Sequence, residues 1–235
     1  MSVKAILFDL DGTLLPMDQD KFIGAYKSGL ITATAKRGYD PKRMGNTILT
    51  GLVAMIKNSG EMTNEEVFLK ALVGEYGGEI MSDLDMFDEF YQTDFQRIQD
   101  VCGFNPRSKE IIERAKSRGF RTVLATSPLF PAVATESRIR WAGLDKNDFE
   151  LVTTYEGSHY CKPNPDYYRE VLSTIRLSPD ECVMVGNDVG DDMVAEGLGI
   201  RVFLLTDCLI NRGNADISVY PSGGVDELIA FIDGL

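Results

Sequence analysis

The chain has 235 residues, enough for one large domain or for one domain with a smaller insert. Its apolar content of 44% suits a globular protein with a hydrophobic core. The formal net charge of -12 argues against nucleic acid and anionic membranes as partners, because both require a basic face on the protein.

The first predicted element is a short buried strand over residues 5–8, and two aspartates follow it closely, Asp9 and Asp11. Alternate residues of a strand point the same way, so the two carboxylates converge if the strand runs through both. Converging carboxylates attract a hard divalent cation, most simply Mg²⁺. The same spacing also fits a strand that ends in a polar turn, with Asp11-Gly12 as a hairpin signal.

Helical patterns dominate the next part of the chain, and no strand-like apolar run occurs there. Phe22, Tyr26 and Leu30 recur at helical spacing, and the polar, acidic run 63–66 is typical of a helix start. We therefore predict an all-helical insert over residues 17–100.

Strands and helices alternate in the rest of the chain. We predict strands over residues 121–126, 149–153, 181–185 and 201–205, and helices over residues 109–117, 132–142, 165–175, 191–198 and 225–232. This alternation is typical of a doubly wound α/β fold, a parallel sheet with helices on both faces. Residues 1–16 and 101–235 would form this Rossmann-like core. Ligands of such sheets bind beyond the carboxyl ends of the strands, so the strand ends are the place to look for chemistry.

Two of the later strand ends carry polar residues that suit a phosphate. The hydroxyl of Thr126 can donate a hydrogen bond to a phosphate oxygen, although a helix cap is the ordinary role of such a residue. Lys162 stands between a strand and a helix that begins with proline, where it can neutralise a phosphate and a carboxylate at once. The ordinary alternative is a solvated surface lysine.

The strand over residues 181–185 is followed by three aspartates within five residues, Asp188, Asp191 and Asp192. Helix capping and dipole complementarity account for one or two of them. The full set indicates a further role, such as completing a metal site.

The cysteines and the hydrophobic runs give expectations about the compartment. The four cysteines are far apart and form no Cys-x-x-Cys pair, so reduced thiols in a cytosolic protein are the simpler interpretation. The first apolar run is too short for a signal-peptide core, and no stretch approaches the ~20 apolar residues that span a bilayer. We expect a cytoplasmic protein.

Taken together, the polar strand ends resemble the four motifs of the haloacid dehalogenase-like hydrolases. The stretch Asp9-Leu10-Asp11-Gly12-Thr13-Leu14 resembles the first motif, and Thr126 stands at the matching position of the second. Lys162-Pro163-Asn164-Pro165 resembles the third. The run 186–192 is similar to the fourth, with Asn187 where the commonest form has aspartate.

The resemblance implies a phosphatase mechanism. Asp9 would attack phosphorus to give an aspartyl-phosphate, and Asp11 would act as general acid to the leaving oxygen and then as base for water. Thr126 and Lys162 would hold the remaining phosphoryl oxygens. Family members that displace halide from carbon lack the second aspartate, so its presence favours phosphate esters.

The resemblance also implies an Mg²⁺ cofactor. Its ligands would be Asp9, the backbone carbonyl of Asp11 and Asp188, completed by waters and a phosphate oxygen. Asp192 is expected behind these ligands rather than on the metal, and Asp191 is the alternative to Asp188.

The helical insert matches the place of the family's cap domain, between the first and second motifs. We predict a Mg²⁺-dependent phosphatase of a small phosphorylated metabolite, either a monomer or a small homo-oligomer. A phosphomutase using the same residues is the alternative enzyme, and a non-catalytic ligand-binding relative is the non-enzyme alternative.

Overall fold

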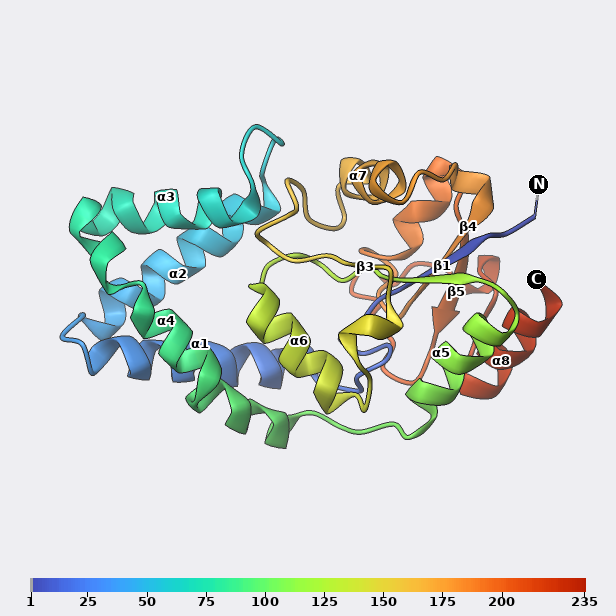
Figure 1. The fold of residues 1–235 in the computed structure, drawn as a ribbon, viewed down its shortest axis with the longest axis horizontal. Coiled ribbons are helices and arrows are strands. Elements are labelled where there is room, and N and C mark those ends of the chain that lie inside the picture. Colours follow the sequence, from blue (N-terminus) through green and yellow to red (C-terminus); the bar gives the residue numbers. More distant parts are fainter. Residues whose placement is uncertain (1) are drawn as a thin grey trace.

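The computed structural model describes residues 2–235 and contains a six-stranded, fully parallel sheet (Figure 1). The strand order is β3-β2-β1-β4-β5-β6, with β1 in the middle of the sheet. The strands are β1 Ala5–Phe8, β2 Arg121–Leu124, β3 Leu151–Val152, β4 Cys182–Gly186, β5 Arg201–Leu205 and β6 Ser222–Gly223. This order confirms the predicted doubly wound α/β class.

The central strand β1 is buried on both faces, because its successive side chains enter two separate hydrophobic clusters. Ile6 and Phe8 of β1 join the larger cluster. Ala5 and Leu7 join the other cluster, which lies on the opposite face of the sheet. Such double burial explains why the first strand is a continuous apolar run rather than an alternating one.

Helices cover the two faces of this sheet. The larger cluster includes residues of α5 Arg107–Ser117, α6 Ala132–Trp141 and α8 Val225–Gly234. The second cluster includes residues of α7 Pro165–Ile175 and the 3₁₀ helix η5 Met193–Leu198. Short 3₁₀ turns η3 Lys146–Asp148, η4 Pro179–Glu181 and η6 Ile217–Val219 complete the connections.

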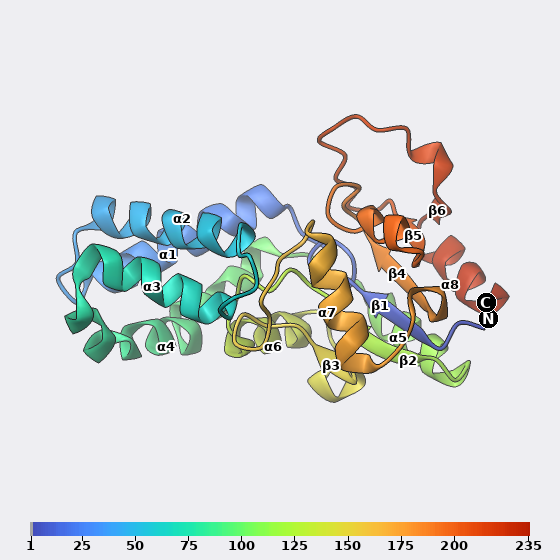
Figure 2. The same ribbon diagram turned by 90° about the horizontal axis from the view of Figure 1, so that it is seen from above.

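The chain between β1 and α5 is helical and extends away from the sheet (Figures 1 and 2). It consists of α1 Gln19–Ala35, α2 Pro41–Ile56, α3 Asn64–Tyr76, η1 Gly78–Asp83, α4 Asp85–Gln92 and η2 Asp94–Val101. Side chains cap the first three of these helices: Asp18 and Asp40 accept backbone N–H groups, and Thr63 forms a capping box with Glu66.

The helical segment leaves and re-enters the core at one place. Met17 and Cys102 form an antiparallel bridge, and the N–H of Gly103 donates to the carbonyl of Pro16 at 2.7 Å. Further contacts join the segment to the core beside α7, where the N–H of Asn64 donates to Ser158 O at 2.8 Å.

Three details of the prediction were wrong. The strand predicted over 149–153 is only Leu151–Val152, because the N–H of Phe149 closes a 3₁₀ turn with Lys146 O at 3.1 Å. The helix predicted over 191–198 is the 3₁₀ helix Met193–Leu198, since the carbonyl of Asp191 accepts the hydroxyl of Tyr168 at 2.7 Å. The two-residue strand β6 was not predicted, because it carries no apolar run.

The structure adds two observations on cysteines and membranes. The cysteines Cys102, Cys161, Cys182 and Cys208 are free. Within residues 2–235, the helices are all too short or too polar to cross a bilayer.

Candidate active site

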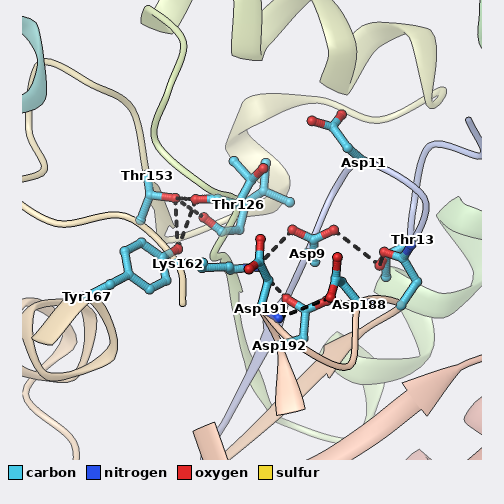
Figure 3. A network of polar contacts seen from close by, with 12 residues as sticks. Asp9, Asp11, Thr13, Thr126, Thr153, Lys162, Tyr167, Asp188, Asp191 and Asp192 are labelled. Atoms are coloured by element: carbon cyan, nitrogen blue, oxygen red, sulfur yellow. Dashed lines mark hydrogen bonds and ion pairs between the residues drawn. The ribbon is translucent and has the colours of Figure 1, made fainter. Parts of the chain in front are cut away.

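A small cavity of about 50 Å³ lies at the carboxyl ends of the central strands. It brings together every side chain that the sequence analysis singled out, although these residues come from four separate stretches of chain (Figure 3). Its lining comprises Asp9, Asp11, Gln19, Thr126, Ser127, Lys162, Asn187, Asp188, Asp191 and Asp192. The first and the last of these stretches lie close together because they follow β1 and β4, which are neighbours in the sheet.

Lys162 is the cation at the base of this cavity. Its side chain is 1% exposed, and its ammonium donates to Asp9 Oδ1 at 2.8 Å and to Asp192 Oδ1 at 2.6 Å. Burial alone would favour a neutral amine, but the carboxylates of Asp192 and Asp9 raise the pKa of Lys162 well above its ordinary value. Lys162 is therefore not the surface lysine that the sequence left open.

Asp9 follows the buried strand β1, and its backbone N–H donates to Val185 O of the neighbouring strand at 2.9 Å. Burial raises the pKa of this carboxyl to about 7; Lys162 opposes the rise, and the carboxylates of Asp192 and Asp11 add to it. Burial is therefore the main reason why the carboxyl group that the sequence analysis proposed as nucleophile has a raised pKa.

Asp11 forms an ion pair that the sequence analysis missed. Its Oδ2 contacts the guanidinium of Arg138 on α6, whose side chain is 0% exposed. Its Oδ1 is buried and has no hydrogen-bond partner among residues 2–235. Burial raises the pKa of Asp11, while the charges of Arg138 and then Lys162 oppose that rise.

The turn after β1 is fixed by Thr13 and Asn187. The hydroxyl of Thr13 lies 3.3 Å from Asp9 Oδ2 and 2.9 Å from Asn187 Oδ1. The amide of Asn187 donates to Cys208 O at 2.7 Å. Gly12 has a φ of +90°, and a Cβ there would lie 2.3 Å from the Asn187 amide nitrogen. Asn187 therefore connects its own loop after β4 to the turn after β1 and to the loop that contains Cys208.

The three aspartates after β4 play different geometric parts. Oδ1 of Asp188 accepts the N–H groups of Gly190 and Asp191 at 2.7 and 3.1 Å, which shapes the turn. Both carboxylate oxygens of Asp192 accept hydrogen bonds. Oδ1 accepts one from the ammonium of Lys162, and Oδ2 accepts one from the Asp188 N–H at 3.0 Å. Burial, followed by the nearby Asp188 carboxylate, raises the pKa of Asp191 to about 6.

Thr126 lies two residues beyond the end of β2 and is 2% exposed. Its carbonyl accepts the hydroxyls of Thr153 at 2.6 Å and Tyr167 at 2.9 Å. These two bonds hold the backbone at the cavity wall, and Figure 3 shows them beside Lys162.

The donor set of the cavity suits a hard divalent cation. Its lining contains five aspartates against one lysine. Oxygen donors with surplus negative charge are what Mg²⁺ prefers, usually with one or two protein carboxylates and several waters. Within residues 2–235, no group of three or more His, Cys, Asp or Glu side chains is arranged to hold a metal ion.

Comparison with known proteins identifies the family. A family model described as haloacid dehalogenase-like hydrolase matches residues 3–199. The chain belongs to this family. The match starts before Asp9 and extends beyond Asp192, so it contains all the predicted site residues.

Curated relatives of this haloacid dehalogenase-like hydrolase are phosphatases. A phosphoglycolate phosphatase of Vibrio vulnificus is 26% identical over 237 residues, which covers 98% of this chain and 95% of the relative. The pyrophosphatase PpaX of Bacillus cereus is 21% identical over 220 residues, covering 94% and 90%. These findings confirm the prediction of a family phosphatase.

Solved structures share the fold. A phosphatase of the same family from Thermococcus onnurineus superposes with a TM-score of 0.61 at 18% identity, covering 99% of both chains. CbbY from Rhodobacter sphaeroides, a mutant solved with xylulose-1,5-bisphosphate, gives a TM-score of 0.58 at 19% identity, covering 96% of this chain and 99% of that one.

Proposed function

We propose that this phosphatase hydrolyses a small phosphorylated metabolite through an aspartyl-phosphate formed on Asp9, with Mg²⁺ as cofactor. The observation that carries the proposal is the position of Asp9, a buried carboxylate that contacts Lys162 at 2.8 Å in a cavity rich in oxygen donors. The small size of the cavity, about 50 Å³, suits a phosphoryl group rather than a whole metabolite.

Each step of the proposed reaction is assigned to one residue of the cavity. Asp9 attacks phosphorus, and Asp11 gives a proton to the leaving oxygen and takes one from water in the second step. Lys162 neutralises a phosphoryl oxygen, and Thr126 holds another at the cavity wall.

The metal would be held by Asp9, the backbone carbonyl of Asp11 and Asp188. When bound, Mg²⁺ supplies charge neutralisation for the phosphoryl group and fixes its orientation. Asp192 is committed to Lys162 and to the Asp188 N–H, so it orients these groups instead of binding the metal. The carboxylate of Asp191 makes no hydrogen bond or ion pair within residues 2–235, and Asp191 remains the alternative to Asp188.

The helical segment, residues 17–100, would act as a cap domain that excludes bulk water and contacts the rest of the substrate. In support, Gln19 of α1 lines the small cavity and also a second cavity of about 410 Å³ between residues 17–20 and 208–212. This second cavity has room for the organic part of a small ester. The relatives named for phosphoglycolate and pyrophosphate point to small anionic substrates. We also propose a cytoplasmic location, consistent with the free cysteines.

The test is phosphate release from 4-nitrophenyl phosphate and from a panel of phosphorylated metabolites, with and without Mg²⁺. Asp9→Asn should abolish turnover, and chelation of the metal should do the same in the wild type. Asp226→Asn, an 82% exposed carboxylate on α8, is the matched control and should be fully active. Full activity of Asp9→Asn would rule the mechanism out. An isomeric sugar phosphate in place of inorganic phosphate would identify a phosphomutase.

A further inference from the structure

Arg138 is a fully buried guanidinium at the boundary between the sheet core and the helical segment. It lies on α6, is 0% exposed and contacts Oδ2 of Asp11. Its Nη2 donates to Thr135 Oγ1 at 3.2 Å, and its Nε to Ala134 O at 3.4 Å. It also stacks over the ring of Phe130, 4.4 Å from the centroid.

Stability alone gives a poor account of this pair. A buried ion pair often contributes no more to folding than apolar side chains of the same volume, because both charges must be removed from water. The surroundings of Arg138 are aromatic and would accept such a replacement, since Phe130 and Phe22 flank it. The partner of Arg138 is the one carboxylate to which the proposed function gives proton transfer, and this coincidence needs an explanation.

We propose that Arg138 is a positioning residue for proton transfer: it anchors Asp11 through Oδ2 and leaves Oδ1 to exchange a proton with the leaving oxygen and then with water. The inference rests on the proposed function, because it assigns a task to a neighbour of the proposed general acid.

The two oxygens of Asp11 support this division of labour. Oδ2 is occupied by the guanidinium, while Oδ1 is buried without a hydrogen-bond partner within residues 2–235. The Asp11 side chain lines the small cavity together with Asp9. In the first step the Asp9–phosphorus bond forms, the bond from phosphorus to the leaving oxygen breaks, and the proton of Asp11 goes to that oxygen. In the second step water attacks phosphorus, the Asp9–phosphorus bond breaks to release inorganic phosphate and the free Asp9 carboxylate, and a proton of the water goes to Asp11.

The anchor itself is fixed from both sides. Thr135 and Phe130 hold Arg138 from the core, and Phe22 of α1 lies 5.8 Å from it on the side of the helical segment. An arginine is suited to this place because its planar fork bonds a carboxylate while its faces stack on aromatic rings. Lysine keeps the charge and loses that geometry.

The experiment compares two aryl phosphates that differ in the basicity of the leaving group. The phenolate of phenyl phosphate is basic and needs a proton to leave, whereas the less basic 4-nitrophenolate leaves readily without one. Arg138→Met should lower kcat/KM about 30-fold or more for phenyl phosphate and less than about 3-fold for 4-nitrophenyl phosphate, because general acid catalysis is worth about 10²–10⁴-fold where it is needed. Arg138→Lys should recover part of the loss.

A matched control lies on the same helix. Arg140 is exposed and contacts Ser137, so Arg140→Met should leave kcat/KM for both substrates unchanged. Thr135→Val removes one bond to Arg138 with little change of volume, and it should show the same substrate discrimination in weaker form if Arg138→Met folds poorly. Equal losses on both substrates in these variants would mean a structural role and would overturn the proposal.

Two further variants separate the failure of this inference from failure of the proposed function. Asp11→Asn should discriminate between the two phosphates as Arg138→Met does, and the double variant should lose no more than Asp11→Asn, because the two residues act as one unit. If the two substitutions lowered kcat/KM independently, so that their effects multiplied in the double variant, the proposed role of Arg138 would be contradicted. An active Asp9→Asn variant would instead refute the phosphatase mechanism itself.

Discussion

The ammonium group of Lys162 lies 2.6 Å from Oδ1 of Asp192, and each side chain is only 1% exposed. The same ammonium contacts Asp9, so one buried cation joins three separate stretches of the chain. A buried charge that loses its partner is strongly unfavourable. The folding of the core and the assembly of the site therefore depend on one ion.

Replacing this cation tests that dependence. Lys162→Met should lower the free energy of unfolding by about 3–5 kcal/mol and abolish phosphatase activity, because Asp9 and Asp192 would be left buried and unpaired. Urea unfolding at pH 7 measures the first effect and phosphate release the second. Lys146→Met breaks a half-exposed pair with Glu136 and should change the stability by less than about 0.5 kcal/mol. Similar, small effects of both substitutions would contradict this account.

The raised pKa of Asp9 predicts how the metal-free protein responds to pH. Because burial lifts this pKa from 3.8 in the unfolded chain to about 7, the folded state favours the neutral acid. This stabilising contribution is complete below pH 3.8 and is lost as the pH rises toward 7. Asp9→Asn should therefore flatten the pH dependence of the free energy of unfolding between pH 4 and 7, as measured in chelator.

Metal binding should show the opposite trend. A metal ligand must be deprotonated, so the Kd for Mg²⁺ should fall up to about tenfold per pH unit below pH 7 and level off above it. Isothermal titration calorimetry across pH 5 to 8.5 gives this profile. A Kd that does not change with pH would show that Asp9 is no ligand.

Gly12 offers a test of the turn after β1. Gly12 and Gly38 both have a φ of +90°, but a Cβ would meet Asn187 only at Gly12, since nothing lies within 4 Å of that position at Gly38. Gly38→Ala should therefore cost only the backbone strain, about 1–2 kcal/mol. Gly12→Ala should cost more and should also inactivate the enzyme, because Thr13 and Asp9 move with the turn. Thermal unfolding measures the loss of stability, and a phosphatase assay measures the loss of activity. Equal losses of stability in the two variants would contradict the proposed contact with Asn187.

The choice between Asp188 and Asp191 as metal ligand is open to direct measurement. Asn at position 188 can still accept the two backbone N–H groups, so Asp188→Asn should fold normally. It should raise the Kd for Mg²⁺ about 100-fold, since ligand charge sets the affinity of such sites. Asp191→Asn should change it less than about threefold. The reverse order would make Asp191 the ligand.

Strands β1 to β5 and the cavity could be predicted from sequence, because each of these strands carries an apolar run, whereas β6 carries none. A continuous apolar run indicates β1. Because parallel strands end at one edge of the sheet, polar residues that follow different strands are predicted to lie close together. Lys162 and Asp192 follow from this rule. The sequence could not pair them with each other, because such pairing depends on packing.

Arg138 could not be found in the same way. It stands in a helix beside Arg140, and both look like surface residues until the packing of α6 buries one and exposes the other. Likewise, the sequence indicated only that Asn187 stands where the commonest form of the fourth motif has aspartate. The structure shows its amide donating to Cys208 O at 2.7 Å, a bond that an aspartate cannot donate. Both roles depend on neighbours that are distant in sequence.

The bridge between Met17 and Cys102 has a consequence for how such proteins diversify. Because the polypeptide departs and comes back through adjacent residues, the intervening stretch can lengthen, shorten or be exchanged without pulling the central strand out of register. Under the proposed cap role, exchange of this stretch would alter substrate preference while the proposed catalytic carboxylates stay where they are.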